Sequence, residues 1–172
     1  MVLPALGQTE ADLTGREHMG FEPCFESDSR ILILGSFPSV ISRKELFYYA
    51  NPLNRFWKTL AKLTGETLPE STADKKAFLS RHRIALWDVV TECDIRGSLD
   101  SNIKNYAVAD VGKILNAAKI EAVFLNGQTA YRIFKKHFPS LSSLAVLLPS
   151  TSPANTRFDY AEWEKALSPY LE

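Results

Sequence analysis

Four short runs of consecutive apolar residues divide the chain and predict buried strands. Apart from Asp88 in the second of them, the runs are continuous rather than alternating, which is typical of strands that are covered on both faces of a parallel sheet. They span Ile31 to Leu34, Ile84 to Val90, Ala122 to Leu125 and Leu144 to Leu148. The sequence therefore predicts a parallel sheet of four strands.

Between and after these runs, apolar residues recur every three or four positions, which is the spacing of helices that bury one face. The predicted helices cover residues 53–63, 108–118, 131–138 and 160–170. Asp159, with Glu162 three residues later, resembles a capping box at the start of the last one. Strands that alternate with helices predict an α/β fold, a three-layer αβα sandwich with a central four-stranded parallel sheet and right-handed crossovers.

Length and composition indicate a single globular domain. The chain has 172 residues, of which 45% are hydrophobic and 23% charged, so disordered and low-complexity classes are excluded. Residues 1–29 have little periodicity and several Gly and Pro residues, so we expect an N-terminal arm or lead-in there and one domain over residues 30–172. Cys24 and Cys93 cannot supply a four-thiolate site, so no metal is expected.

The hydropathy pattern also bears on where the protein works. No stretch approaches the roughly 18 consecutive apolar residues of a membrane span. The first residues lack a basic region followed by a long apolar run, as a secretory signal would have. We therefore expect a cytoplasmic protein without membrane contact.

Charge is unevenly distributed although 20 basic and 20 acidic residues cancel. Residues 1–29 hold six acidic residues and one basic residue, whereas residues 30–157 hold 18 basic and 10 acidic residues. A basic surplus of this kind fits a surface that faces phosphate groups. Lysines scattered over solvated helix faces would give the same count.

Ligands of an open parallel sheet bind beyond the carboxyl ends of its strands, and two loops there carry candidate chemistry. The loop after the first run has neither a phosphate-loop nor a dinucleotide motif, so no nucleotide cofactor is expected. Aromatic rings at Phe37, Tyr48 and Tyr49 could stack on a planar ring. Asn51 and Pro52 could instead be a helix N-cap and the proline that follows it.

Asn54 fits that capping interpretation less well, because it would lie inside the first helical turn and could project toward the end of the sheet. After the last run, residues 149–155 are rich in hydroxyl groups and bracketed by prolines. Such a loop suits contacts to phosphate oxygens, although it could also be a plain turn.

Five blocks in order, each at an expected strand end, are GSFPS, YYANPLNRFW, ALWDVVTECDIRGSLDSNIKN, LNGQTAYRIF and LPSTSPAN. Together they resemble the uracil-DNA glycosylase superfamily and, within it, the hypoxanthine-DNA (deoxyinosine) glycosylase branch. The resemblance implies a monofunctional DNA glycosylase of base excision repair. Such an enzyme would act as a monomer, without a cofactor, and hydrolyse the N-glycosidic bond of a flipped deaminated nucleotide, deoxyinosine being the first choice.

The family pattern assigns roles with some departures. Phe37 stands where better-known branches carry a catalytic aspartate or asparagine, and the hypoxanthine branch points instead to Asn54, with Asn51 second. Ser150 replaces a catalytic histidine or asparagine, and Ala154 a leucine that wedges into the duplex. The candidate catalytic residues are thus Asn54, Asn51 and Ser36, the base-binding residues are Phe37, Tyr49, Asp88 and Gly35, and the DNA-binding residues are Ser150, Ser152, Asn155 and Arg157.

Cleavage of an N-glycosidic bond places positive charge on the sugar and negative charge on the departing base. Asn54 would orient a water molecule beneath the sugar. The Asp88 carboxylate would accept from N1–H of hypoxanthine, and a backbone N–H near Gly35 or Ser36 would donate to O6. No lysine has a context for Schiff-base chemistry, so base release without strand cleavage is expected. Two alternatives stay open, namely a uracil or mismatched-thymine glycosylase and a catalytically inert nucleic-acid-binding module.

Overall fold

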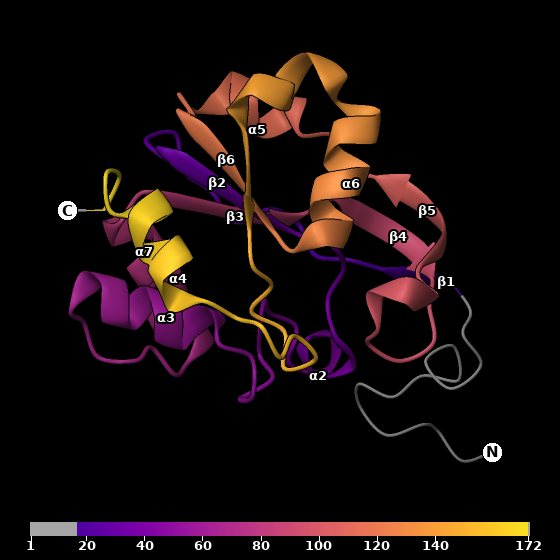
Figure 1. Ribbon diagram of the computed structural model, residues 1–172, viewed down its shortest axis with the longest axis horizontal. Coiled ribbons are helices and arrows are strands. Elements are labelled where there is room, and N and C mark those ends of the chain that lie inside the picture. Colours follow the sequence, from indigo (N-terminus) through magenta and orange to yellow (C-terminus); the bar gives the residue numbers. More distant parts are fainter. Residues whose placement is uncertain (1–16, 172) are drawn as a thin grey trace.

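The computed structural model describes residues 17–171, and its centre is a parallel sheet of four strands (Figure 1). The strands lie in the order β3-β2-β6-β7. They are β2 (Ile31–Gly35), β3 (Ile84–Asp88), β6 (Ala122–Asn126) and β7 (Ala145–Leu148), each parallel to its neighbours. The predicted four-stranded parallel sheet is confirmed.

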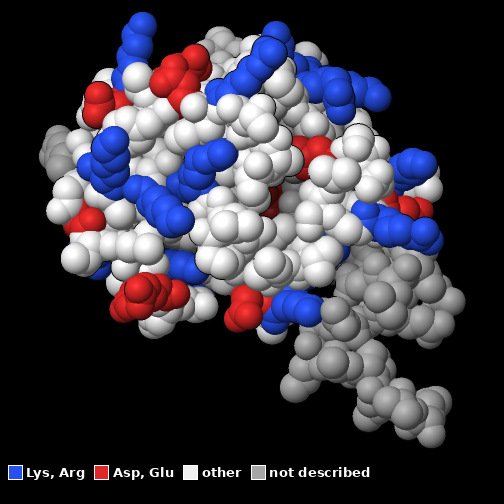
Figure 2. All heavy atoms as spheres, turned by 60° about the horizontal axis from the view of Figure 1, so that its bottom comes forward, with Lys and Arg blue, Asp and Glu red and all other residues white. Residues whose placement is uncertain are grey.

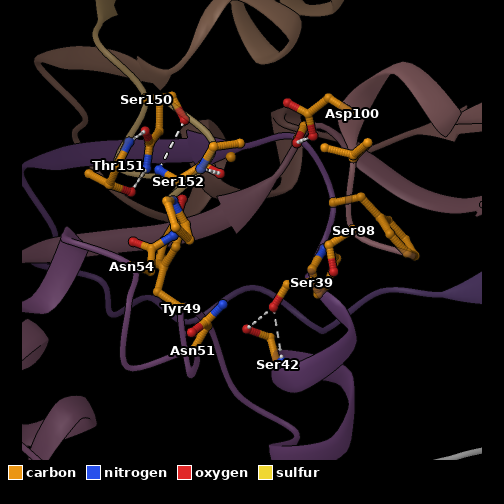
Figure 3. A pocket seen from close by; sticks show the side chains of 18 of the residues that line it. Ser39, Ser42, Tyr49, Asn51, Asn54, Ser98, Asp100, Ser150, Thr151 and Ser152 are labelled. Carbon is orange, nitrogen blue, oxygen red and sulfur yellow. Dashed lines mark hydrogen bonds between the residues drawn. The ribbon is translucent and has the colours of Figure 1, made fainter. Parts of the chain in front are cut away.

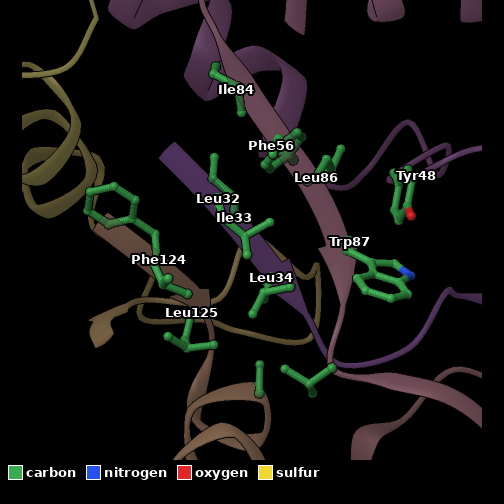
Figure 4. Close-up of a cluster of buried hydrophobic side chains, with 14 of the residues drawn as sticks. Leu32, Ile33, Leu34, Tyr48, Phe56, Ile84, Leu86, Trp87, Phe124 and Leu125 are labelled. Carbon is green, nitrogen blue, oxygen red and sulfur yellow. The ribbon is translucent and has the colours of Figure 1, made fainter. Parts of the chain in front are cut away.

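The core lies on both faces of this sheet. Every residue of β2, β3 and β6 is buried, as the unbroken apolar runs predict. Leu32, Ile33 and Leu34 of β2 contact their neighbours on β3 and β6 (Figure 4). A sheet buried in this way has rigid strand ends, which is what an active site at that edge requires.

Helices cover the sheet on its two sides (Figure 1). On one side lie α5 (Gly112–Ala117) and α6 (Gln128–His137), and on the other lie α3 (Phe56–Thr64), α4 (Thr72–Arg81) and α7 (Tyr160–Leu167). The Asp159 carboxylate accepts from the Ala161 N–H at 3.0 Å, so the N-cap predicted for α7 is confirmed. The three-layer sandwich is confirmed, although α2 (Val40–Glu45) and α4 were not predicted. None of the helices within residues 17–171 is long and apolar enough to cross a membrane.

A second, antiparallel sheet of three strands was also not predicted. It consists of β1 (Glu17–Met19), β4 (Val90–Asp94) and β5 (Lys104–Val108), in the order β1-β4-β5. The run from Ile84 to Val90 gives no sign of where β3 ends and β4 begins, because the residues before and after Val89 are buried as well. Short 3-10 helices follow at η1 (Asp100–Asn102) and η2 (Pro139–Leu144).

The lead-in predicted over residues 1–29 needs a correction in its second half. Residues 1–16 lie outside the described residues, but β1 pairs with β4 from Glu17 onward. Cys24 forms an antiparallel bridge with Leu86, and the Trp87 indole N–H donates to the Phe21 carbonyl at 2.9 Å. This segment covers the edge strand β3, whose backbone groups would otherwise be exposed, so it is part of the packed domain.

Candidate active site

A cavity of about 460 Å³ opens at the carboxyl ends of the parallel strands. Its volume lies within the roughly 300–1,000 Å³ that is typical of small-molecule sites. Strands β2, β3 and β6 each contribute their last residue, and the loops after β2, before α3, around η1 and after β7 complete it. Figure 3 shows Tyr49 and Asn54 on one side of the cavity and Ser98 and Asp100 on the other.

Tyr49 gives the cavity a flat aromatic wall. Its ring stacks on the Phe56 ring at a centroid distance of 4.0 Å and an interplanar angle of 23°. The backbone of Tyr49 has φ 52°, a left-handed conformation that is strained for a residue with a side chain. The loop is anchored on either side of Tyr49, because the Trp57 indole N–H donates to the Tyr48 carbonyl and the Ala50 N–H to the Ser42 hydroxyl. The fold thus holds this ring in one position.

Gly35, the last residue of β2, brings Asp88 and Tyr49 close to the same point. A Cβ atom on Gly35 would lie 2.5 Å from Asp88 Oδ1 and 2.7 Å from the Tyr49 hydroxyl. No side chain fits there, so only glycine leaves this part of the cavity open. Asp88 faces Gly35 across the sheet, as the last pair of the β2–β3 register.

The surroundings of Asp88 bear on the charge of its side chain. Burial, followed by the nearby Asp100 carboxyl, raises the pKa of Asp88 to about 8. These surroundings favour the protonated acid over the carboxylate expected from the sequence. Burial and Asp88 also raise the pKa of the Tyr49 hydroxyl, which stays neutral.

Asp100 lines the cavity and was missed by reasoning from sequence. The Ser36 hydroxyl donates to Asp100 Oδ1 at 2.6 Å, which joins the loop after β2 to η1. Burial raises the pKa of Asp100, while hydrogen bonds from Ser36 and Thr129 lower it. The only signal in the sequence was the cluster of Ser98, Asp100, Ser101 and Asn102 around Leu99 within the third block. Ser36, a candidate catalytic residue, thus holds a loop in place.

Both candidate asparagines line the cavity and use one side-chain oxygen in a local turn. Asn54 Oδ1 accepts from the Phe56 N–H at 2.9 Å, and Asn51 Oδ1 accepts from the Leu53 N–H at 3.0 Å. Within the described part of the chain, the Asn54 NH2 group has no protein partner. The bond to Phe56 therefore fixes the amide and leaves its NH2 group available to a ligand.

The alternative role of Asn51 as a helix N-cap is wrong. Helix α3 begins at Phe56, after an N-cap at Arg55 that has no side-chain hydrogen bond. The Arg55 N–H donates instead to the Thr151 carbonyl at 3.0 Å. A contact between two distant loops thus sets the start of this helix, which no local pattern could indicate.

The loop after β7 is tied to β6 by a reciprocal pair of hydrogen bonds. The Asn126 amide donates to Thr151 Oγ1 at 2.9 Å, and the Thr151 N–H donates to Asn126 Oδ1 at 3.0 Å. Both residues are buried. The Arg55 guanidinium also donates to the carbonyls of Ser152 and Asn155, each at 3.0 Å.

We expect Asn126→Ala to lower the free energy of unfolding by about 1–3 kcal/mol, because the buried Thr151 N–H then loses its acceptor. Urea unfolding measures the change. Ser142→Ala is the matched control, since its hydroxyl bonds locally to the Pro139 carbonyl at the surface, and it should cost less than about 0.5 kcal/mol. Equal effects of the two substitutions would contradict the role given to the Asn126–Thr151 pair.

Three of the four candidate DNA-binding residues lie at the cavity. Ser150, Ser152 and Asn155 line it, whereas Arg157 does not. The hydroxyl oxygens of Ser150 and Ser152 accept backbone N–H groups within the loop, which leaves their O–H groups free to donate. Ala154, which replaces the wedge leucine, also lines the cavity, and so does Leu99, which is 56% exposed.

Charge is arranged in zones on this face of the molecule. The acidic residues that line the cavity are Asp88 and Asp100, and no Lys or Arg is among the lining residues that the structure describes. Figure 2 shows acidic atoms inside the hollow, uncharged residues around it and Lys and Arg side chains farther out. This arrangement suits a ligand with a neutral group inside and phosphates outside. Between residues 17 and 171, no three His, Cys, Asp or Glu residues are grouped to hold a metal.

A parallel α/β sandwich with an aromatic-walled cavity at the carboxyl ends of its strands is the class of protein that the fold and the site define. The uracil DNA glycosylase superfamily is the family whose model matches, over residues 23–170. A Methanosarcina acetivorans protein named hypoxanthine DNA glycosylase is 35% identical over 153 residues, or 84% of this chain and 94% of the relative. A protein of the same name from Methanosarcina barkeri is 31% identical over 143 residues, which cover 80% of this chain and 88% of that relative.

The fold comparison agrees. A solution NMR structure of a Methanosarcina acetivorans protein, considered a uracil DNA glycosylase, matches with a TM-score of 0.78 at 31% identity. The match covers 90% of this chain and 98% of that one. The chain therefore belongs to the uracil DNA glycosylase superfamily, and by class it is a DNA glycosylase, a hydrolase of N-glycosidic bonds.

The structure brings most of the candidate residues together. All but Arg157 line the cavity: Gly35, Ser36, Phe37, Tyr49, Asn51, Asn54, Asp88, Ser150, Ser152 and Asn155. Phe37 is only 9% exposed, with the Arg43 guanidinium 5.6 Å from its ring centre. It therefore belongs largely to the core and presents little ring surface to a ligand.

Proposed function

We propose that this DNA glycosylase removes hypoxanthine from deoxyinosine in DNA and leaves the strand intact. The observation that carries the proposal is the juxtaposition, in one cavity, of the Tyr49 ring, the Asp88 carboxyl and the Asn54 amide. Two relatives named hypoxanthine DNA glycosylase, which match over at least 80% of this chain, support the choice of base.

The extruded base stacks on the open face of Tyr49, the other face being covered by Phe56. Asp88 contacts the N1–H of the base, and a backbone N–H near Gly35 or Ser36 donates to O6. Extrusion costs a few kcal/mol and is least costly where pairing is already poor, as at a mispaired inosine. The hydroxyls of Ser150 and Ser152 contact the phosphates beside the flipped nucleotide.

Asn54 orients the water that attacks the sugar. An amide is a poor base, so this role suffices if the N-glycosidic bond is largely broken before the water attacks. The hydrogen bond from Phe56 to Asn54 Oδ1 supports this role, because it holds the amide in one orientation. No lysine lines the cavity in the described part of the chain, which supports base release without a Schiff base.

Matched oligonucleotides that carry one inosine, one uracil or one mismatched thymine test the proposal. We expect hypoxanthine to be released fastest, with strand breaks appearing only after alkali treatment. Faster release of uracil or thymine would favour the alternative substrates. Tight binding to inosine DNA without release of any base would favour an inert binding module.

A further inference from the structure

A buried carboxyl group without a hydrogen-bond partner faces the cavity. Asp88 is 5% exposed and lines the cavity. Its Oδ2 atom is buried and makes no hydrogen bond to any residue that the structure describes. Folded proteins seldom leave such an atom unpaired, because an unmade buried hydrogen bond is costly. The Asp88 carboxyl is thus placed to bond to a ligand in the cavity.

The groups around Asp88 are neutral or acidic. Asp100 approaches from η1, and the Tyr48 and Tyr49 hydroxyls approach from the loop before α3. Gly35 on β2 contributes no side chain, and Asn126 on β6 is engaged with Thr151. No described basic residue forms an ion pair with Asp88. A negative charge would therefore stand here without compensation, and the protonated acid is the favoured form.

We propose that Asp88 is a further catalytic residue, a neutral carboxylic acid that donates a hydrogen bond to the oxo group of the extruded base as its N-glycosidic bond breaks. This inference rests on the proposed function. A carboxylic acid carries an acceptor and a donor side by side. One oxygen can accept from N1–H while the O–H group donates to O6.

The donated bond stabilises the charge that develops on the leaving base. The bond between the sugar C1′ and the base nitrogen breaks with both electrons passing to the base. Water supplies its oxygen to C1′ and releases a proton, and the base takes up a proton from solvent, so the reaction is a net hydrolysis. Asp88 keeps its own proton throughout. A carboxylate in its place would repel the departing anion.

Single-turnover rates on an inosine duplex between pH 6 and pH 9.5 test this role. We expect the wild-type rate to fall as pH rises through about 8, where Asp88 loses its proton. Asp88→Asn, whose amide is a permanently neutral donor and acceptor, should retain activity and lack this fall. Asp88→Ala should be about 100-fold slower than the wild type below pH 7 and should lack the fall at higher pH, because it has no donor to lose. Ionisation of the base itself affects the wild type and both variants equally, so a comparison of their pH profiles isolates the effect of Asp88.

Neighbouring acids provide matched controls. Asp100→Asn removes the acidic neighbour that raises the pKa of Asp88, so the midpoint of the wild-type pH profile should move to lower pH. Asp110→Asn removes an exposed acid outside the cavity and should leave the profile unchanged. The inference is overturned if Asp88→Asn loses as much activity as Asp88→Ala, or if the wild-type rate stays flat up to pH 9.5.

A stability measurement separates this inference from the proposed function. Because the folded pKa of Asp88 is raised from 3.8 to about 8, the protonated acid stabilises the wild type fully below the unfolded pKa, and this contribution is lost as pH rises to about 8. Asp88→Asn should lack that loss in thermal unfolding over the same range. A wild type inactive on inosine DNA refutes the proposed function, whereas identical pH dependences of unfolding refute the neutral acid.

Discussion

Replacing Asn54 by alanine is expected to lower the single-turnover rate of hypoxanthine release about 100- to 1,000-fold. Loss of one preorganised group that acts in the transition state typically costs about 2.7–4 kcal/mol. The affinity for an uncleavable inosine duplex should change little, because Tyr49 and Asp88 still hold the base. Rapid-quench assays and fluorescence anisotropy measure the two quantities separately.

Two further variants control for the second role of Asn54. Its side-chain oxygen accepts from the Phe56 N–H in a local turn, so alanine also removes this hydrogen bond and should cost about 1 kcal/mol of stability. Asn54→Ser keeps an acceptor oxygen but cannot hold the water in the same place, and it should be stable yet inactive. If Asn51→Ala is the slower enzyme, the water is positioned by Asn51 and the assignment to Asn54 is wrong.

Gly35→Ala is expected to lower kcat/KM at least about 100-fold, which corresponds to about 2.7 kcal/mol. The new methyl group would lie 2.5 Å from Asp88 Oδ1 and 2.7 Å from the Tyr49 hydroxyl. Tyr49 cannot withdraw easily because its ring is stacked on Phe56, and Asp88 is enclosed. The methyl group therefore occupies the space that the edge of the base needs. Steady-state kinetics on an inosine duplex measure the loss.

Gly112→Ala is the matched control for this substitution. Gly112 lies at the start of α5, outside the cavity, and a Cβ there would meet only the Asp110 carboxylate at 3.2 Å. Its kinetics should match those of the wild type. Wild-type activity in Gly35→Ala, with the fold intact by circular dichroism, would show that the base does not approach this strand end.

The candidate site shows where reasoning from sequence succeeded. Gly35 directly follows the predicted run that ends at Leu34, whereas Asp88 was singled out by the family resemblance, inside a run that was predicted to continue to Val90. Ser150 and Ser152 likewise follow the last predicted run, in the loop after β7. Asp100 was not found, because it follows β4 in the antiparallel sheet, which no alternating pattern in the sequence predicted. Its proximity to Ser36, 64 residues earlier in the chain, is a tertiary contact.

The apolar pattern alone determined the parallel sheet and most of its covering helices, since burial on both faces demands unbroken apolar strands. Tertiary structure alone decided three properties. The contact between Arg55 and Thr151 sets the start of α3, and the packing of residues 17–29 on β3 makes a supposed arm part of the domain. The raised pKa of Asp88 depends on its burial and on the nearby Asp100 carboxyl. Each depends on a contact between residues that are separated along the chain, and the sequence around each residue does not indicate its partner.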